Sequence, residues 1–141
     1  MLKYRLLDHT ADIRVEVWGK TRKELFGNAM KAMFDVMVNM SVDSETKPLE
    51  EKTLKIKGSD LEDTLINFLR EALYLFNGQG WLVRGCEPLE LTGRYIVARL
   101  QGEPYNPQKN QLKTEIKAVT YHGLIIKKYK NSWQAKVVFD V

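Results

Sequence analysis

Two carboxylates and an imidazole lie within five consecutive residues near the start of the chain, in the run Asp8-His9-Thr10-Ala11-Asp12. Groups of this kind, when so close together, favour a bound cation, a shared proton or strong hydrogen bonding unless they are solvated. The same residues also suit a turn, because Asp8 and Thr10 can bond to nearby backbone and His9 can be a satisfied core residue. Spacing alone favours turn chemistry over a metal site.

Further acidic groups stand at the other end of the sequence, which finishes with Phe139-Asp140-Val141. If the last strand is ordered to its end, the Asp140 side chain and the α-carboxylate of Val141 share one small volume. The alternative is a frayed end with a solvated aspartate. With Asp12 and Asp8, these oxygens are hard ligands of the kind that Ca²⁺ or Mg²⁺ prefers. Spacing does not place the two ends of the chain together.

The remaining residues do not form a recognisable catalytic set. The sequence has two histidines, no Gly-x-Ser-x-Gly elbow and no glycine-rich phosphate loop that opens a helix. His122 is expected in a turn between strands, and Lys117 is expected on a solvent-facing side of an otherwise apolar stretch. The single cysteine, Cys86, excludes an intramolecular disulfide and suits an apolar filler. These observations favour a binding or activating protein over an enzyme.

Length and composition are those of one globular domain, residues 1–141, with 44% hydrophobic and 28% charged residues. Charges interrupt the longest apolar runs and the start lacks a signal-type apolar core, so we expect a cytoplasmic protein without a membrane partner. The net charge of +4 is compatible with an anionic partner. Lys127, Lys128 and Lys130 flank an expected hairpin turn, where a solvated strand edge is favoured over RNA binding.

The periodicity of apolar residues predicts an α+β fold in which two helices pack on a mostly antiparallel sheet. Each helix follows a strand that ends in glycine and opens with a capping box, Thr21 to Glu24 in one case and Ser59 to Glu62 in the other. The first helix is expected to end near residue 38, and the second at Asn77-Gly78. Strands are expected at 12–19, 52–57, 81–83, 87–91, 94–100, 114–121, 123–130 and 133–141, with loops at 43–51 and 102–110 and a turn at 131–132.

With both ends in view, the chain resembles the archease family. The resemblance rests on the opening Asp-His-Thr-Ala-Asp with its following strand to Trp18-Gly19, on Glu-Ile-Lys-Ala-Val-Thr-Tyr-His at 115–122, and on Trp-Gln-Ala-Lys-Val-Val-Phe-Asp-Val at 133–141. It covers essentially the whole chain, and the combination of the opening with the Phe-Asp-Val ending is more specific than either alone.

The resemblance implies a small protein that activates an RtcB-type RNA ligase, the tRNA-splicing ligase, without being an enzyme itself. It implies faster guanylylation of the ligase from GTP, multiple turnover and broader nucleotide use. The family's metal site corresponds to Asp12, Asp140 and the terminal carboxylate of Val141, with Ca²⁺ as the expected ion. Lys117 matches a lysine implicated in activation. Asp8 and His9 are expected to support Asp12 or contact the partner.

Two other functions stay open at this point. One is a chaperone or modulator of an RNA-modifying enzyme such as a tRNA methyltransferase. The other is a metal-dependent hydrolase that uses Asp8, Asp12 and Asp140. The expected association with tRNA is indirect, through the ligase, and DNA is not an expected partner.

Overall fold

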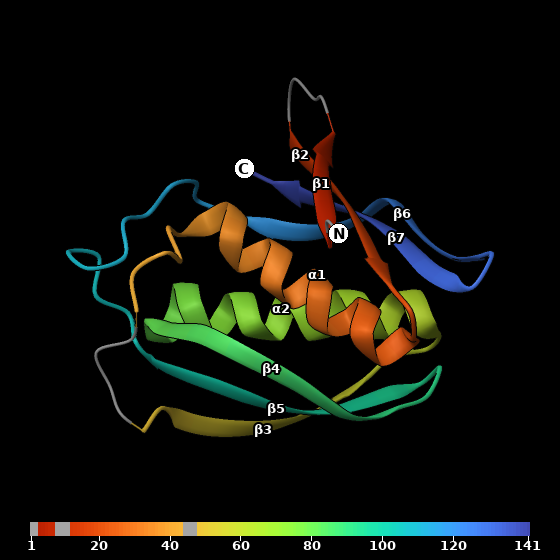
Figure 1. The fold of residues 1–141 in the computed structure, drawn as a ribbon, viewed down its shortest axis with the longest axis horizontal. Coiled ribbons are helices and arrows are strands. Elements are labelled where there is room, and N and C mark those ends of the chain that lie inside the picture. The colour runs from red at the N-terminus through yellow and green to blue at the C-terminus, as the bar shows by residue number, and fades with distance from the viewer. Residues whose placement is uncertain (1–2, 8–11, 44–47) are drawn as a thin grey trace.

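A computed structural model describes residues 3–7, 12–43 and 48–141 of the chain. Asp8 and His9 therefore lie outside the described residues. Along the described chain the elements follow in this order (Figure 1): β1 (Tyr4–Leu7), β2 (Asp12–Gly19), α1 (Arg22–Met37), β3 (Glu50–Lys57), α2 (Leu61–Gln79), β4 (Trp81–Leu91), β5 (Tyr95–Pro104), β6 (Ala118–Tyr129) and β7 (Ser132–Asp140).

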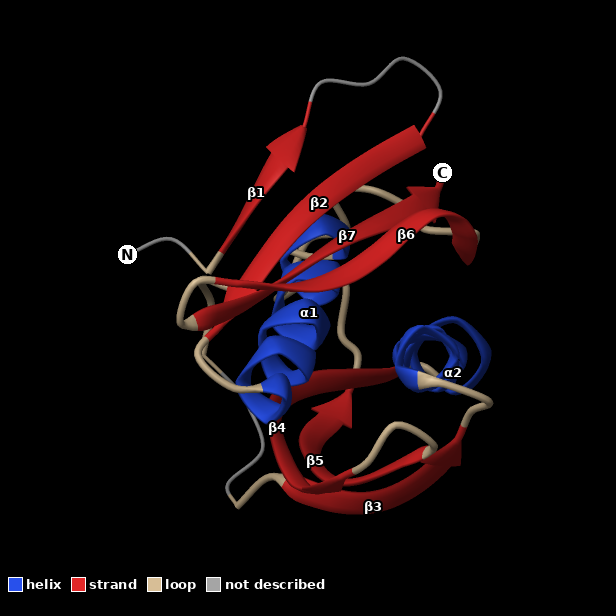
Figure 2. Cartoon of the chain, turned by 90° about the vertical axis from the view of Figure 1, so that its right-hand side faces the viewer, coloured by secondary structure: helices blue, strands red, loops and turns tan. Residues whose placement is uncertain are grey.

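The strands form two antiparallel sheets with the helices between them (Figure 2). The first sheet has the order β1-β2-β7-β6 and the second the order β3-β5-β4. The predicted α+β class is confirmed, with a sheet on both sides of the helices instead of one. A helix with a single apolar stripe can cover only one sheet. Phe26, Ala29 and Met33 of α1 are all buried, together with most of their neighbours on that helix, so α1 can contact both sheets.

Both helices begin with a side-chain cap, although the second begins one residue later than predicted. The Thr21 hydroxyl accepts a hydrogen bond from the Glu24 N–H at 3.0 Å, as the first capping box predicts. In α2 the cap is Asp60 instead of Ser59, and its carboxylate accepts from the Asp63 N–H at 2.8 Å. The Asp63 carboxylate in turn accepts the Ser59 N–H at 2.8 Å, so two aspartates perform the reciprocal capping.

The two strand-to-helix junctions share one geometric feature that the sequence suggested. A Cβ atom at Gly19 would collide with the backbone nitrogen of Leu25, and one at Gly58 would collide with the backbone nitrogen of Thr64. Both glycines are therefore required by close backbone approach to the first turn of the following helix. At its far end α2 runs past the predicted stop and finishes at Gln79, because Gly80 takes the left-handed conformation with φ 64°.

Several predicted strand boundaries are wrong because bulges join segments that the sequence separates. β4 is continuous, with shifts in its pairing to β5 between Val83 and Gly85 and between Pro88 and Glu90. β6 runs through the predicted turn at His122, where its pairing with β7 shifts between Thr120 and Ile125. β5 extends into the predicted loop at 102–110. Residues 114–117, predicted as the start of a strand, lie outside the strands. β1 was not predicted at all. The hairpin turn lies at 130–131.

Apolar side chains from both helices and both sheets form a single core cluster. Aromatic contacts join the helices within it: the rings of Phe26 and Phe68 stack with centroids 6.1 Å apart, and those of Phe34 and Phe76 meet edge to face at 5.8 Å. The inward face of β7 carries Ala135, Val137 and Phe139, which are all buried. Within the described residues, neither helix has the length and apolarity needed to cross a membrane.

Candidate metal-binding and partner-contact site

Asp12 and Asp140 are direct cross-strand partners. Asp12 is the first residue of β2 and Asp140 is the last residue of β7, and the register of the two antiparallel strands pairs their Cα atoms. Residues paired in this way project from the same face of a sheet, with Cβ atoms about 4.5–5.5 Å apart. The first residue of β2 and the last residue of β7 therefore meet at one end of the two central strands of the first sheet, a relationship that spacing alone did not provide.

Backbone hydrogen bonding brings Lys117 to the same place. The Lys117 N–H donates to the Asp140 carbonyl at 2.7 Å, and the next residue, Ala118, pairs with Asp140 in the ladder between β6 and β7. Lys117 is exposed, as predicted, whereas Ile116 beside it is fully buried. The acidic tip, as we call the group of Asp12, Asp140 and Val141, thus has a lysine next to it.

The acidic tip also has an arginine nearby. Arg14 lies two residues along β2 from Asp12, and its Nε is 4.0 Å from Asp12 Oδ1, an ion-pair distance too long for a hydrogen bond. The Asp12 side chain is 22% exposed, while Asp140 and Val141 are open to solvent. Opposed carboxylates on neighbouring strands repel one another, so a cation placed between them would be stabilising.

The donor set of the acidic tip suits a hard divalent cation but does not complete its coordination. Among the described residues, no group of three or more His, Cys, Asp or Glu side chains is placed to hold a metal. Asp12 and Asp140 supply two side-chain carboxylates, and the third group that the resemblance assigns to the site is the carboxylate expected at Val141. Calcium takes six to eight oxygen ligands. Water or groups from a partner would have to supply the remainder.

Sequence reasoning missed a polar cluster that joins α2 to β6. The Tyr121 hydroxyl donates a short hydrogen bond to the Asp63 carboxylate, and the Arg70 guanidinium carbon lies 4.8 Å from the centroid of the Tyr121 ring. This bond lowers the pKa of Asp63 and raises the pKa of Tyr121. The side chains of Arg70 and Asn77 also donate to carbonyl groups of the segment beside Lys117. No local pattern signals such contacts between distant parts of the chain.

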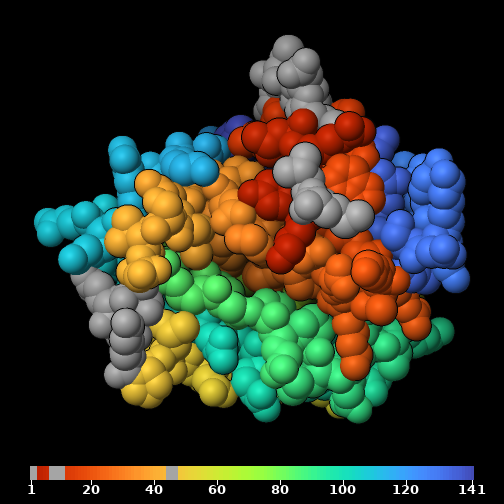
Figure 3. Space-filling view, viewed as in Figure 1, coloured from red at the N-terminus to blue at the C-terminus, as the bar shows by residue number. Residues whose placement is uncertain are grey.

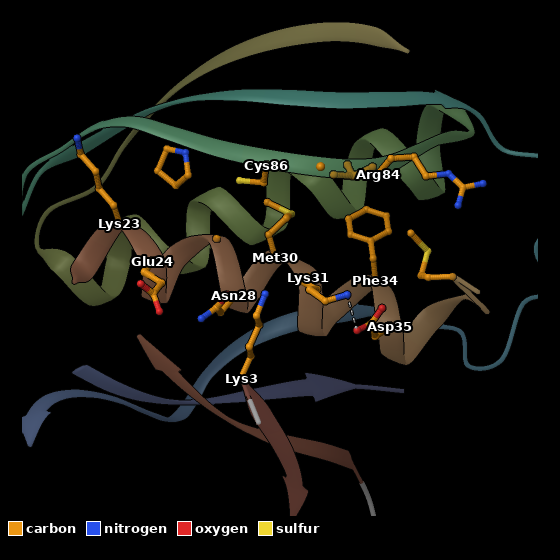
Figure 4. A pocket seen from close by; sticks show the side chains of 15 residues that line it. Lys3, Lys23, Glu24, Asn28, Met30, Lys31, Phe34, Asp35, Arg84 and Cys86 are labelled. Carbon is orange, nitrogen blue, oxygen red and sulfur yellow. Dashed lines mark ion pairs between the residues drawn. The ribbon is translucent and has the colours of Figure 1, made fainter. Parts of the chain in front are cut away.

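A cavity of about 340 Å³ lies elsewhere, between α1, β4 and Lys3. It belongs to the face on which α1, in orange, separates the red N-terminal residues from green β4 (Figure 3). In its wall Lys31 Nζ lies 3.3 Å from Asp35 Oδ2. Figure 4 shows this ion pair on α1 and Cys86 on the β4 side. Burial raises the pKa of the Cys86 thiol to about 12, so it is a poor nucleophile. Asp12, Asp140 and Val141 do not line this cavity, so the cavity does not place a nucleophile beside the acidic tip.

Comparison with known proteins assigns nearly the whole chain to one family. The model of the Archease protein family matches residues 4–141. The chain belongs to the archease family. It is 41% identical to "Protein archease" of Methanosarcina acetivorans over 144 residues, which cover 99% of this chain and 96% of that one.

Solved structures support the fold of this archease family member. A solution structure of a Methanobacterium thermoautotrophicum protein is similar with a TM-score of 0.75 and 24% identity, covering 99% of each chain. A crystal structure described as an archease and possible chaperone, from Thermotoga maritima, is similar with a TM-score of 0.65 and 26% identity, covering 96% of this chain and 94% of that one.

Proposed function

We propose that this archease family member activates an RtcB-type tRNA-splicing RNA ligase by promoting its GTP-dependent guanylylation and multiple turnover. Membership of the family, over nearly the whole chain, supports the proposal. So do the sequence segments at both ends that carry the resemblance. The observation on which it rests most directly is the register that pairs Asp12 with Asp140, since it makes one acidic site from the two most specific segments of the sequence.

In this proposal the acidic tip holds a divalent cation, Ca²⁺ being the expected one. Asp12, Asp140 and the main-chain carboxylate of Val141 are its ligands, and the opposition of the first two supports this assignment. A bound cation would neutralise the converging carboxylates and hold the end of β7 beside the start of β2. These three ligands leave the coordination shell of the cation incomplete, so groups from the ligase can fill the remaining positions.

The acidic tip is proposed to enter the active site of the ligase, where its carboxylates help position the ligase's metal ions or reshape the nucleotide pocket. Lys117 contacts the same partner, since its backbone is bonded to Asp140 and its side chain is exposed. Asp8 and His9 are proposed to support Asp12 or to contact the ligase. The association with tRNA is indirect, through the ligase, without DNA or a membrane as partner.

The experiment that tests this function is a guanylylation assay with purified ligase, GTP and sub-stoichiometric amounts of this protein. The proposal predicts that guanylylation is accelerated and that each ligase molecule completes many ligations. Replacing Asp12 or Asp140 by alanine should abolish the stimulation. Glu90→Ala is the matched control, because it removes an exposed carboxylate from β4, in the other sheet. Stimulation that survives both tip substitutions would contradict the proposal.

A chaperone function is the second candidate, because the similar Thermotoga maritima structure is described as a possible chaperone. It predicts that stoichiometric amounts of this protein keep an RNA-modifying enzyme, such as a tRNA methyltransferase, from aggregating. It also predicts that the ligase is not stimulated at catalytic ratios. Hydrolytic activity that depends on Asp12 and Asp140 in the absence of any ligase would instead support the metal-dependent hydrolase.

A further inference from the structure

A hollow of about 310 Å³ lies between α2 and the edge strand β6, directly beside Lys117. Figure 2 shows α2 running close to β6. Its wall carries the cations of Arg70 and Lys117, the phenol of Tyr74 and the amide of Asn77. Among the described residues that line it there is no carboxylate. A concave surface with two cations and no acid attracts an anion.

Arg70 is held in a fixed orientation across this hollow. Its Nε donates to the Val119 carbonyl at 3.0 Å, and its guanidinium carbon lies over the Tyr121 ring, 4.8 Å from the centroid. The Tyr121 ring is itself fixed by its bond to Asp63. A guanidinium has five N–H donors in a planar fork, and the contact with Val119 uses one of them. The terminal donors of a fork oriented in this way are suited to bind phosphate bidentately.

The wall of the hollow that faces α2 is held in place by hydrogen bonds to its backbone. The Asn77 amide donates to the Ile116 carbonyl at 3.0 Å, and the Lys117 N–H donates to the Asp140 carbonyl at 2.7 Å. The backbone position of Lys117 is therefore fixed at the wall of the hollow. Tyr74 lines the same hollow and is 55% exposed, which leaves its ring available to stack on a nucleobase.

We propose that the hollow between α2 and β6 binds a phosphate group of a nucleotide, with Arg70 and Lys117 as its cations and Tyr74 beside the base. A guanidinium, an ammonium group and an exposed aromatic ring together fit a nucleotide better than they fit a simple carboxylate. The phosphate can belong to a free nucleoside triphosphate or to an RNA strand. The proposal extends the proposed function, because it places a nucleotide next to the acidic tip.

A purely structural role is the competing explanation for Arg70, since its bond to Val119 also caps a carbonyl on the edge strand. The two explanations differ for Lys117, whose exposed side chain is not needed to protect that edge. A phosphate site predicts that Lys117→Gln weakens binding as Arg70→Gln does. An edge cap predicts that only the Arg70 substitution has an effect, on stability.

The test is direct binding to the isolated chain of residues 1–141, without ligase, so that a failure to bind is distinguishable from failure of the proposed activation. GTP and a short single-stranded RNA with a terminal phosphate serve as separate probes, followed by calorimetry and by amide chemical shifts. We expect at least one probe to shift the amides of residues 70–77 and 117–119. Arg70→Gln and Lys117→Gln should each weaken that binding by about tenfold to a hundredfold.

Lys55→Gln is the matched control, because it removes an exposed cation on β3, in the other sheet. It should leave the affinity unchanged. Binding of GTP alone would assign the hollow to a free nucleotide, and binding of RNA alone would assign it to a strand. Binding of neither probe, or a loss of affinity that is equal in all three variants, would overturn the proposal. A Lys127→Gln protein that loses RNA affinity while the Arg70→Gln protein retains it would also overturn it.

Discussion

Asp12 and Asp140 face each other across β2 and β7, the two central strands of the first sheet. The pairing aligns the start of one strand with the end of the other, so that carboxylates far apart in the sequence project from one face. Like charges in directly opposed positions destabilise a sheet. A protein that keeps them there has either an opposing cation or a function for the charge.

The first prediction concerns the stability of this pair. In a chelator, Asp12→Asn should stabilise the fold by at most about 1 kcal/mol, because it removes one of two opposed charges but also the ion pair with Arg14. Added Ca²⁺ should raise the Tm of the parent protein and should not raise that of the Asp12→Asn protein. Thermal unfolding with and without Ca²⁺ measures both effects. Equal shifts in the two proteins would mean that the cation binds elsewhere.

The second prediction concerns the ion pair of Arg84 and Glu103. Arg84 Nε lies 2.7 Å from Glu103 Oε2 with both side chains nearly buried, and the same guanidinium donates to Asn110 and to the Val42 carbonyl. Arg84→Ala should therefore cost about 3–5 kcal/mol, since it removes a nearly buried guanidinium that pairs with Glu103 and also bonds Asn110 and the Val42 carbonyl. Denaturant unfolding measures the loss.

Arg99 provides the comparison for that measurement. It makes two ion pairs, to Glu51 at 3.4 Å and to Glu87 at 2.9 Å, but its side chain is 42% exposed. Exposed pairs contribute at most about 1 kcal/mol. Arg99→Ala should be correspondingly mild, and equal losses for the two arginines would refute the importance we assign to burial.

The third prediction concerns the strand-to-helix junctions. Gly58→Ala should destabilise the fold by more than about 2 kcal/mol, because the added methyl group would collide with the backbone of Thr64 at the start of α2. Gly93→Ala is the control, since a Cβ there meets nothing within 4 Å. Its effect should stay within about 0.5 kcal/mol. Urea unfolding of both variants gives the comparison, and a tolerated Gly58→Ala would disprove the close approach.

The fourth prediction concerns Cys86. Its pKa in the folded protein is raised to about 12 by burial, from 9.0, so the folded state disfavours the thiolate. In the folded protein the alkylation rate of Cys86 should be low at pH 8 and should keep rising above pH 9. In the urea-unfolded chain this rate should level off near pH 9. Mass spectrometry of the peptide that contains Cys86 follows the rate. A plateau near pH 9 in the folded protein would show an accessible thiol instead.

The strand periods, the helix caps and the α+β class could be predicted from the sequence because local patterns determine them. Alternation identified β2 and β7, and the capping box located the start of α1 at Thr21. The continuity of β4 and β6 and the division into two sheets were missed because they depend on tertiary contacts. Bulges joined the pieces of β4 and β6, and the division into two sheets followed from the burial of α1 on several sides.

For the candidate site, the sequence supplied the residue types but not their arrangement. Asp12, Asp140 and Lys117 were selected from motifs, while their proximity depends on the register of β2, β7 and β6. Arg70 and Tyr121 could not be found in advance, because a contact between residues of two distant elements has no local signal. Asp8 and His9 stay predictions, since they lie outside the described residues.

The central claim is that the acidic tip activates an RNA ligase, and multiple-turnover ligation tests it most directly. Purified RtcB-type ligase, GTP and RNA substrate are mixed with catalytic amounts of this protein or of its Asp140→Ala or Glu90→Ala variant, each first shown to be folded. We expect many ligations per ligase molecule with the parent and with Glu90→Ala, and at most a single round with Asp140→Ala. Equal turnover with all three proteins, or none with the parent, would contradict it.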